Sequence, residues 1–142
     1  MEIALTTVIV ISTVLLSAKG IETYRNYLAE MQLKAAANTV VADIIYLQQK
    51  NLFNGEKRPY SLDAEEWGYI IRSNKVFLKK VTFAQINCSK VYFAQGSTSI
   101  TFSNNGTPRG KCYLDLRHRS LQKFYYRINV EPVTGRVVVH EK

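Results

Sequence analysis

The first hydrophobic run of the chain differs from everything that follows it. Residues 3–18 (IALTTVIVISTVLLSA) contain no charged residue, no proline and no glycine. A helix over this segment is apolar on all faces, and a single small head has too little interior to enclose such a helix. The pattern therefore predicts that residues 1–20 form an apolar helical stem that lies in a membrane or in the core of a filament.

The start of the chain does not fit a secretory signal. Such a signal has a basic region before its apolar stretch, whereas this chain begins Met-Glu and has no lysine or arginine before Lys19. A transmembrane helix needs about 20 apolar residues. The sixteen residues of the apolar segment are slightly short of that length. We therefore expect a thin or laterally packed span.

A second helical pattern follows the apolar stem. Gly20 weakens a helix by up to about 1 kcal/mol relative to alanine, which predicts a bend or a locally unwound stretch there. Apolar residues then recur at spacings of three and four up to Lys50, which indicates an amphipathic helix over residues 21–50. The predicted apolar face consists of Ile21, Tyr24, Leu28, Met31, Ala35, Val41, Ile44, Ile45 and Leu47.

After residue 51 the pattern indicates strands. Short runs rich in β-branched and aromatic residues alternate with turn signals, which is typical of an antiparallel sheet or sandwich. The predicted strands cover residues 68–72, 75–80, 91–94, 99–103, 111–117, 124–130 and 136–140. The first two form a hairpin. The predicted fold is therefore α+β, in which a long N-terminal helix, residues 1–50, packs on a β-rich globular head, residues 51–142.

Positive charge is concentrated in this head. Residues 1–50 carry four basic and four acidic residues, whereas residues 51–142 carry fifteen and seven. Within residues 75–123, nine basic residues accompany the single acid Asp115. This excess is either the electrostatic footprint of a polyanion-binding protein or a solvated basic surface that keeps the head in solution. The candidate polyanion contacts are Lys79, Lys80, Arg109, Lys111, Arg117 and Arg119.

The two cysteines, Cys88 and Cys112, both lie in the β-rich part. Their spacing is not that of a metal site, because no CxxC or Cys/His cluster accompanies them. Outside the cytoplasm a disulfide between them is permitted, and closing such a loop stabilises a fold by about 3 kcal/mol. The alternative is two buried free thiols.

Catalytic and metal-binding patterns are missing from the sequence. The two histidines, His118 and His140, lie in a basic run and near the C-terminal end, respectively. No nucleophile elbow, Walker loop, HExxH motif or dinucleotide fingerprint occurs. The acidic residues Asp63 and Glu65-Glu66 fit a loop or a helix start better than an acid/base pair. We therefore expect no enzymatic activity, no metal site and no cofactor.

Three segments resemble type IV pilins and the related pseudopilins. Residues 24–49 (YRNYLAEMQLKAAANTVVADIIYLQQ) look like the stem of the pseudopilin H and minor pilin T group. Residues 99–106 (SITFSNNG) and 126–142 (YRINVEPVTGRVVVHEK) look like the strand-turn and the closing strand pair of that group. The G-R-V-x-V-x-x-K ending is similar to that of the Gram-positive competence pseudopilin D. The overall architecture of the whole chain resembles that of the group. Specific sequence motifs resemble it only in the stem and the tail.

The resemblance implies a processed N-terminus. Family members carry a leader that a prepilin peptidase cuts immediately before the apolar helix, and the new first residue is methylated. Tyr24 lies as far from Met1 as the corresponding aromatic residue lies from the mature terminus in relatives, so Met1 is expected to be the processed first residue. The family's usual glutamate at the fifth mature position is replaced by Leu5, and the nearest acid is Glu2.

The function implied by the resemblance is that of a structural subunit of a type IV pilus-like or type II secretion-like filament. Before assembly the chain would be a single-pass protein of the inner or cytoplasmic membrane. Afterwards it would polymerise with copies of itself or with other pilins in an extracellular or envelope filament. The residues expected to mediate assembly are Met1, Glu2, Leu5, Val8, Val10, Val14, Leu15 and Gly20.

Two other functions remain open at this point. The first is a minor pilin of a competence system that binds DNA through the basic head, with an affinity that falls steeply as salt rises. The second is a single-span membrane protein unrelated to pilins, which would form no polymer.

Overall fold

One long α-helix, one short 3-10 helix and eight strands make up the part of the chain that is described. The computed structural model describes residues 2–53, 59–73 and 76–142, without the side chains of residues 2–10, Leu15 and Gln122. The elements are α1 (Glu2–Phe53), β1 (Ser61–Glu65), β2 (Gly68–Ser73), β3 (Val76–Thr82), η1 (Phe83–Ile86), β4 (Val91–Gly96), β5 (Ser99–Thr101), β6 (Cys112–His118), β7 (Leu121–Val130) and β8 (Val137–Glu141). The predicted α+β class is confirmed.

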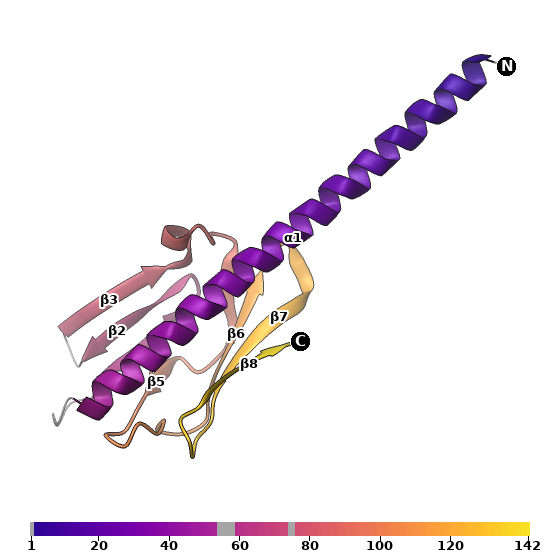
Figure 1. Cartoon of the computed structure of the whole chain (residues 1–142). Helices are drawn as coiled ribbons and strands as arrows, with labels where there is room; N and C mark the ends of the chain where they lie inside the picture. Colours follow the sequence, from indigo (N-terminus) through magenta and orange to yellow (C-terminus); the bar gives the residue numbers. More distant parts are fainter. Residues whose placement is uncertain (1, 54–58, 74–75) are drawn as a thin grey trace.

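Helix α1 is a single unbroken rod. Its C-terminal half lies against the strands, and its N-terminal half projects away from them (Figure 1). The predicted bend at Gly20 is therefore wrong. One glycine costs a helix only about 1 kcal/mol, which is too little to interrupt a rod with good helix formers on both sides. The helix also continues past the predicted end at Lys50 to Phe53.

The strands form two four-stranded antiparallel sheets. The first has the order β3-β2-β1-β5 and the second has the order β4-β6-β7-β8. The predicted hairpin is confirmed as β2 and β3, although residues 74 and 75 at its tip lie outside the described residues. Strand β1 was not predicted, because Asp63 and Glu65 are typical of loops. In the fold, the carboxylate of Asp63 pairs with Arg72 on β2.

The two sheets meet where β4 passes the turn between β1 and β2. The Phe93 amide donates a hydrogen bond of 2.9 Å to the carbonyl of Glu66. The Phe93 ring also lies 5.1 Å from that of Phe83 and 6.5 Å from that of Tyr69, measured between ring centroids. Both sheets consequently lie along the same half of α1 (Figure 1).

The core forms between the sheets and one face of α1. This face is built from buried residues at spacings of three and four, which is the helical period. On the helix these residues are Ala29, Leu33, Ala36, Ala37, Val40, Ile44 and Leu47. From the strands, the largest fully buried side chains are Leu62, Tyr69, Ile71, Ile100, Leu114, Leu116 and Ile128, joined by Phe83 from η1 and by Phe102, which follows β5. The small alanines allow the strands to approach the helix backbone closely.

The buried face of α1 is not the predicted one over most of its length. Of the predicted apolar face, Ile44 and Leu47 are buried and Val41 is partly buried, whereas the other residues are exposed. The exposed members are Ile21, Tyr24, Leu28, Met31, Ala35 and Ile45. The helix therefore has two apolar stripes, and only the stripe rich in alanine is covered by the head.

Candidate functional site

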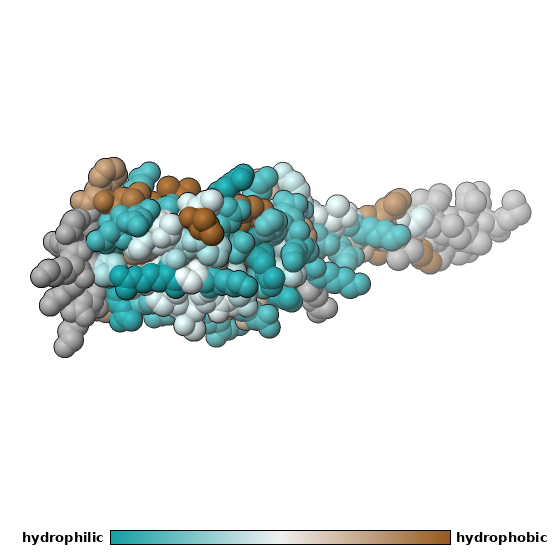
Figure 2. Space-filling view, turned by 90° about the horizontal axis from the view of Figure 1, so that it is seen from below, coloured by the Kyte–Doolittle hydropathy of each residue, from teal (hydrophilic) through white to brown (hydrophobic). Residues whose placement is uncertain are grey.

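The first candidate site is the apolar stripe of α1 that the head leaves uncovered. Val14, Ile21, Tyr24, Leu28 and Met31 follow one another at helical spacings, and each is between 41% and 61% exposed. In the space-filling view, hydrophobic side chains interrupt the hydrophilic surface along the projecting part of the helix (Figure 2). An exposed patch of this kind marks a surface that contacts a partner or a lipid phase.

Most of the predicted assembly residues lie outside the part of the chain whose side chains are described. Met1 lies outside the described residues, and so do the side chains of Glu2, Leu5, Val8, Val10 and Leu15. Val14 is 60% exposed, and Gly20 has open space around it, since no atom lies within 4 Å of an added Cβ. Among the residues whose side chains are described, no helical stretch is long and apolar enough to cross a membrane.

The six predicted polyanion contacts do not form one cluster. Lys79 is held by Asp43 in an ion pair of 2.7 Å, and Lys80 is exposed on β3 in the first sheet. Arg109 lies beside β5, since its amide bonds the Thr101 carbonyl. The other three lie at the second sheet: Arg117 is part of β6, and Lys111 and Arg119 lie just outside its two ends.

The second candidate site is the outer face of the second sheet. Leu114 and Ile128 on β6 and β7 point to the core, so Tyr113 and Arg127 beside them in sequence point away from it. The pairing registers place rows of outward side chains across all four strands. One row is Tyr92, Arg117, Tyr125 and Lys142; the next is Gln95, Asp115, Arg127 and His140. We call this surface the Tyr–Arg face.

Cations and aromatic rings are stacked on one another across the Tyr–Arg face. The Arg117 guanidinium lies 4.8 Å from the centroid of the Tyr125 ring, and that of Arg127 lies 4.9 Å from the Tyr113 ring. At the β4 edge, Arg119 lies over Trp67 at 4.5 Å. Such contacts hold the guanidinium groups in fixed positions without neutralising them.

Asp115 neutralises one of these cations. Both carboxylate oxygens accept hydrogen bonds of 2.7 Å from Arg127, and Asp115 itself is 2% exposed. This bidentate pairing raises the pKa of Arg127 above its ordinary value. Arg117 and Lys111 have no such partner among the interactions described for this face, so the face keeps an excess of positive charge.

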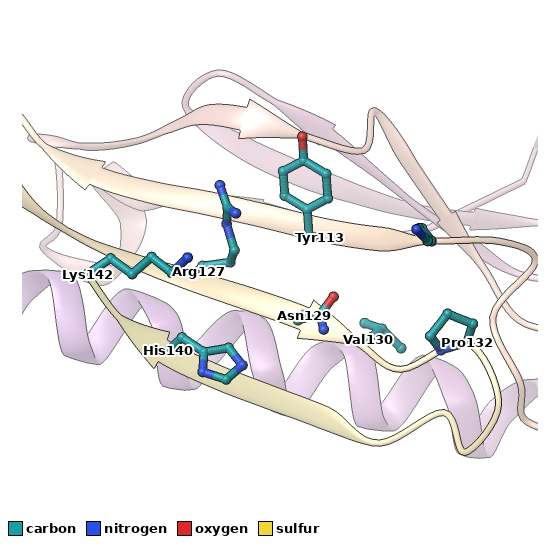
Figure 3. A pocket seen from close by; sticks show the side chains of 8 residues that line it. Tyr113, Arg127, Asn129, Val130, Pro132, His140 and Lys142 are labelled. Atoms are coloured by element: carbon teal, nitrogen blue, oxygen red, sulfur yellow. The ribbon is translucent and has the colours of Figure 1, made fainter.

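A hollow of about 400 Å³ lies at one end of the Tyr–Arg face. Figure 3 shows its side chains on β6, β7 and β8 and just beyond their ends, with α1 behind the sheet. The hollow is lined by Lys111, Tyr113, Arg127, Asn129, Val130, Pro132, His140 and Lys142. It therefore combines an aromatic ring, an amide and several cations, which is a lining suited to an anionic ligand with a flat apolar part.

Sequence reasoning found only part of this face, because it selected Lys111, Arg117 and Arg119 but not Tyr113, Tyr125 or Arg127. It assigned the basic charge to a stretch of sequence, residues 75–123. Side chains alternate between the two faces of a strand. This alternation in β6 and β7 could have assigned Tyr113, Tyr125 and Arg127 to the outer face and Tyr126, which is buried, to the core. The burial of Tyr126 and its hydrogen bond to Glu141 raise its pKa to about 12.

A buried polar cluster joins α1 to the first sheet. Asp43 is 8% exposed and accepts a hydrogen bond of 2.5 Å from the Tyr69 hydroxyl. Lys79 donates to both oxygens of Asp43 at 2.7 and 2.8 Å. Burial, together with the adjacent carboxylate, raises the pKa of Tyr69. Each of the three side chains in this cluster has a hydrogen-bond partner, which is typical of a structural contact.

His118 joins the second sheet to α1 at the point where the helix leaves the head. Its Nδ1 accepts a hydrogen bond from the Ser120 amide at 3.1 Å, so the proton of the neutral ring is on Nε2. The Nε2–H group then donates to Gln32 Oε1 at 3.0 Å. The imidazole is 3% exposed, and burial followed by the charge of Lys90 lowers its pKa.

The environment of His118 predicts a loss of stability in acid. The unfolded chain binds a proton near pH 6.5, whereas the folded chain resists it, so the free energy of unfolding falls as the pH drops below about 6.5. The groove beside His118 is also lined by Glu22, Arg25 and Lys90, whose net charge is positive and opposes protonation. Urea unfolding of the full chain at pH 7.5 and 5.5 measures the effect.

The control for this prediction is His118→Gln, which keeps a side-chain amide donor and removes the titrating group. Its stability is expected to change less between the two pH values than that of the unsubstituted chain. An equal loss in both proteins would assign the acid sensitivity to other groups.

Cys88 and Cys112 are buried free thiols, so the predicted disulfide is not formed and its alternative holds. Cys88 Sγ donates to the carbonyls of Gln32 and Ile86 at 3.3 Å, whereas Cys112 begins β6 and bonds Gly110. The two thiols pack in separate environments. Burial raises the pKa of both, which keeps them protonated and unreactive at neutral pH.

Comparisons with protein-family models, curated proteins and solved structures find no significant match to this chain. Within the described residues, no group of three or more histidine, cysteine or acidic side chains is placed to hold a metal ion. The fold class is therefore carried by the structure alone: an α+β protein with a long N-terminal helix and antiparallel sheets.

Proposed function

We propose that the chain is a structural subunit of a type IV pilus-like or type II secretion-like filament. Residues 3–18 form its apolar stem, which rests in the inner or cytoplasmic membrane until a prepilin peptidase has acted and the subunit is assembled. The stem then packs among the stems of neighbouring subunits. In this proposal the two sheets form a sandwich-like head at the filament surface.

The observation that carries the proposal is the uncovered apolar stripe on α1. The head buries one face of the helix from Ala29 onward, whereas Ile21, Tyr24 and Leu28, on the part of the helix that precedes it, are exposed. Exposing such a stripe to water is unfavourable, by about 25 cal/mol for each Å² of apolar surface. A neighbouring stem helix that covers the stripe removes this cost.

The shape of the molecule supports the same proposal. Helix α1 is continuous from Glu2 to Phe53, so its projecting half is held in a fixed direction by the half that is packed in the head. A rigid projecting rod can enter a bundle of parallel rods while the heads stay outside. With a flexible linker at Gly20, the packed half of the helix would not hold the projecting half in a fixed direction.

A carboxylate in the uncovered stripe is expected to block assembly. In Leu28→Asp, the new charge would be buried against a neighbouring stem without a partner, so the yield of filaments should fall by more than about tenfold. The fold of the head should be retained, because Leu28 is 41% exposed in the single subunit. Electron microscopy of fibres sheared from cells, with the subunit identified by mass, measures the yield.

The matched control is Thr23→Asp, which introduces the same charge on another face of the projecting helix, where Thr23 is exposed. It should leave filament yield unchanged. Normal filaments from Leu28→Asp would refute the stripe as the assembly surface. A chain that stays monomeric in the membrane, with no fibre under any condition, would favour a single-span protein unrelated to pilins.

A further inference from the structure

The Tyr–Arg face has a composition that filament assembly does not require. It lies on the side of the second sheet that is turned away from α1, and therefore away from the proposed stem contacts (Figure 3). We infer that this face binds single-stranded nucleic acid, with phosphates on its cations and a base stacked in the hollow beside Tyr113.

Charge favours a polyanion. Asp115 is buried and already held by Arg127, so its charge is offset within the face. Lys111 and Arg117 then remain to contact phosphates. At the β4 edge, Glu66 lines a hollow with Arg117 and Tyr92. Near β8, Glu141 accepts a hydrogen bond from the Tyr126 hydroxyl, and Glu131 accepts one from Thr134. The bound nucleic-acid strand therefore lies over β7 and β8, away from the β4 edge.

Aromatic exposure favours a single strand over a duplex. Tyr113 is 38% exposed, and its ring lines the hollow together with the Arg127 guanidinium that lies over it. Unstacked bases pack on aromatic rings and on arginine planes, and they do so with little dependence on sequence. A duplex offers only its phosphates to such a face, so the rings would contribute nothing to its binding.

The size of the hollow fits one nucleotide. Its volume of about 400 Å³ lies in the range of sites for small ligands. Asn129 supplies an amide that can donate to and accept from a base edge. Lys111 also lines the hollow and supplies a phosphate contact. An acidic peptide could use the cations, but it has no group that needs the flat aromatic surface.

The experiment measures binding of the full chain in detergent micelles to a fluorescent oligothymidylate of about 20 nucleotides by anisotropy. Tyr113→Leu removes the ring and is expected to weaken binding by about tenfold, whereas Tyr113→Phe keeps it and should bind as the unsubstituted chain does. Lys111→Gln should reduce the slope of log affinity against log salt by roughly 0.7. The control is Tyr27→Leu, which removes an exposed tyrosine from α1.

Three results would overturn the inference. The first is no salt-sensitive binding at low ionic strength. The second is equal binding by Tyr113→Leu and the unsubstituted chain, since stacking would then contribute nothing. The third is equal affinity for a duplex or for polyphosphate, which would indicate a general polyanion surface. None of these results bears on filament assembly, because Tyr113 lies away from α1 and the Leu28→Asp test does not involve the Tyr–Arg face.

Discussion

Truncating Leu33 to alanine is expected to lower the free energy of unfolding by about 3 kcal/mol. The side chain is fully buried between α1 and the sheets. Its removal loses the transfer free energy of the missing carbons and leaves a cavity that the surrounding strands can close only in part. Urea unfolding of the full chain in detergent micelles, followed by near-ultraviolet circular dichroism, gives the value.

The matched control is Leu28→Ala, on the exposed stripe of the same helix. The same atoms are removed from a side chain that is 41% exposed, so the change should stay within about 0.5 kcal/mol in the monomer. The pair tests which face of α1 the head covers. A larger loss for Leu28→Ala than for Leu33→Ala would mean that the helix is rotated relative to the sheets.

Removing the carboxylate of Asp43 is the other substitution expected to have a large effect. In Asp43→Ala the Tyr69 hydroxyl, whose residue is 1% exposed, loses its acceptor, and Lys79 loses its counter-ion. A buried donor without a partner costs about 1–3 kcal/mol. Because the Lys79 side chain is 48% exposed and can turn to water, the total loss should be about 2–3 kcal/mol, less than for a fully buried pair.

Two further variants test this account of the cluster. Tyr69→Phe removes the donor while Lys79 still holds Asp43, so it should cost less than Asp43→Ala. The double variant Asp43→Leu with Tyr69→Phe replaces both buried partners by apolar groups and should be more stable than Asp43→Ala alone. If Asp43→Ala unfolds at the same urea concentration as the unsubstituted chain, the cluster does not stabilise the fold.

Much of the secondary structure could be predicted from local pattern. The strands from β2 onward lie within two or three residues of their predicted positions, because each has β-branched or aromatic residues between turn signals. Strand β1 was missed since its charged residues resemble a loop. Its charge at Asp63 is stable in a sheet because Arg72 lies beside it on the neighbouring strand, a pairing that local pattern does not contain.

The candidate sites could be predicted only in part. Excess positive charge is a property of composition, so it was visible in the sequence. Its arrangement was not, because registers between distant strands decide which cations share a face. Tyr92, Arg117 and Tyr125 form one row only when β4, β6 and β7 have paired. Lys79, by contrast, is directed to Asp43 on α1.

By itself the sequence determined that the chain begins with a long helix and continues as antiparallel strands, because hydrophobic period and turn residues act locally. Only the tertiary structure decided which of two apolar stripes on α1 the head covers. Both stripes have helical spacing, and the choice depends on close packing. The head packs on the face of Ala36 and Ala37, where small side chains admit the strands, whereas Tyr24 precedes Ala29, the first buried residue among those described, and Met31 stays exposed on another face.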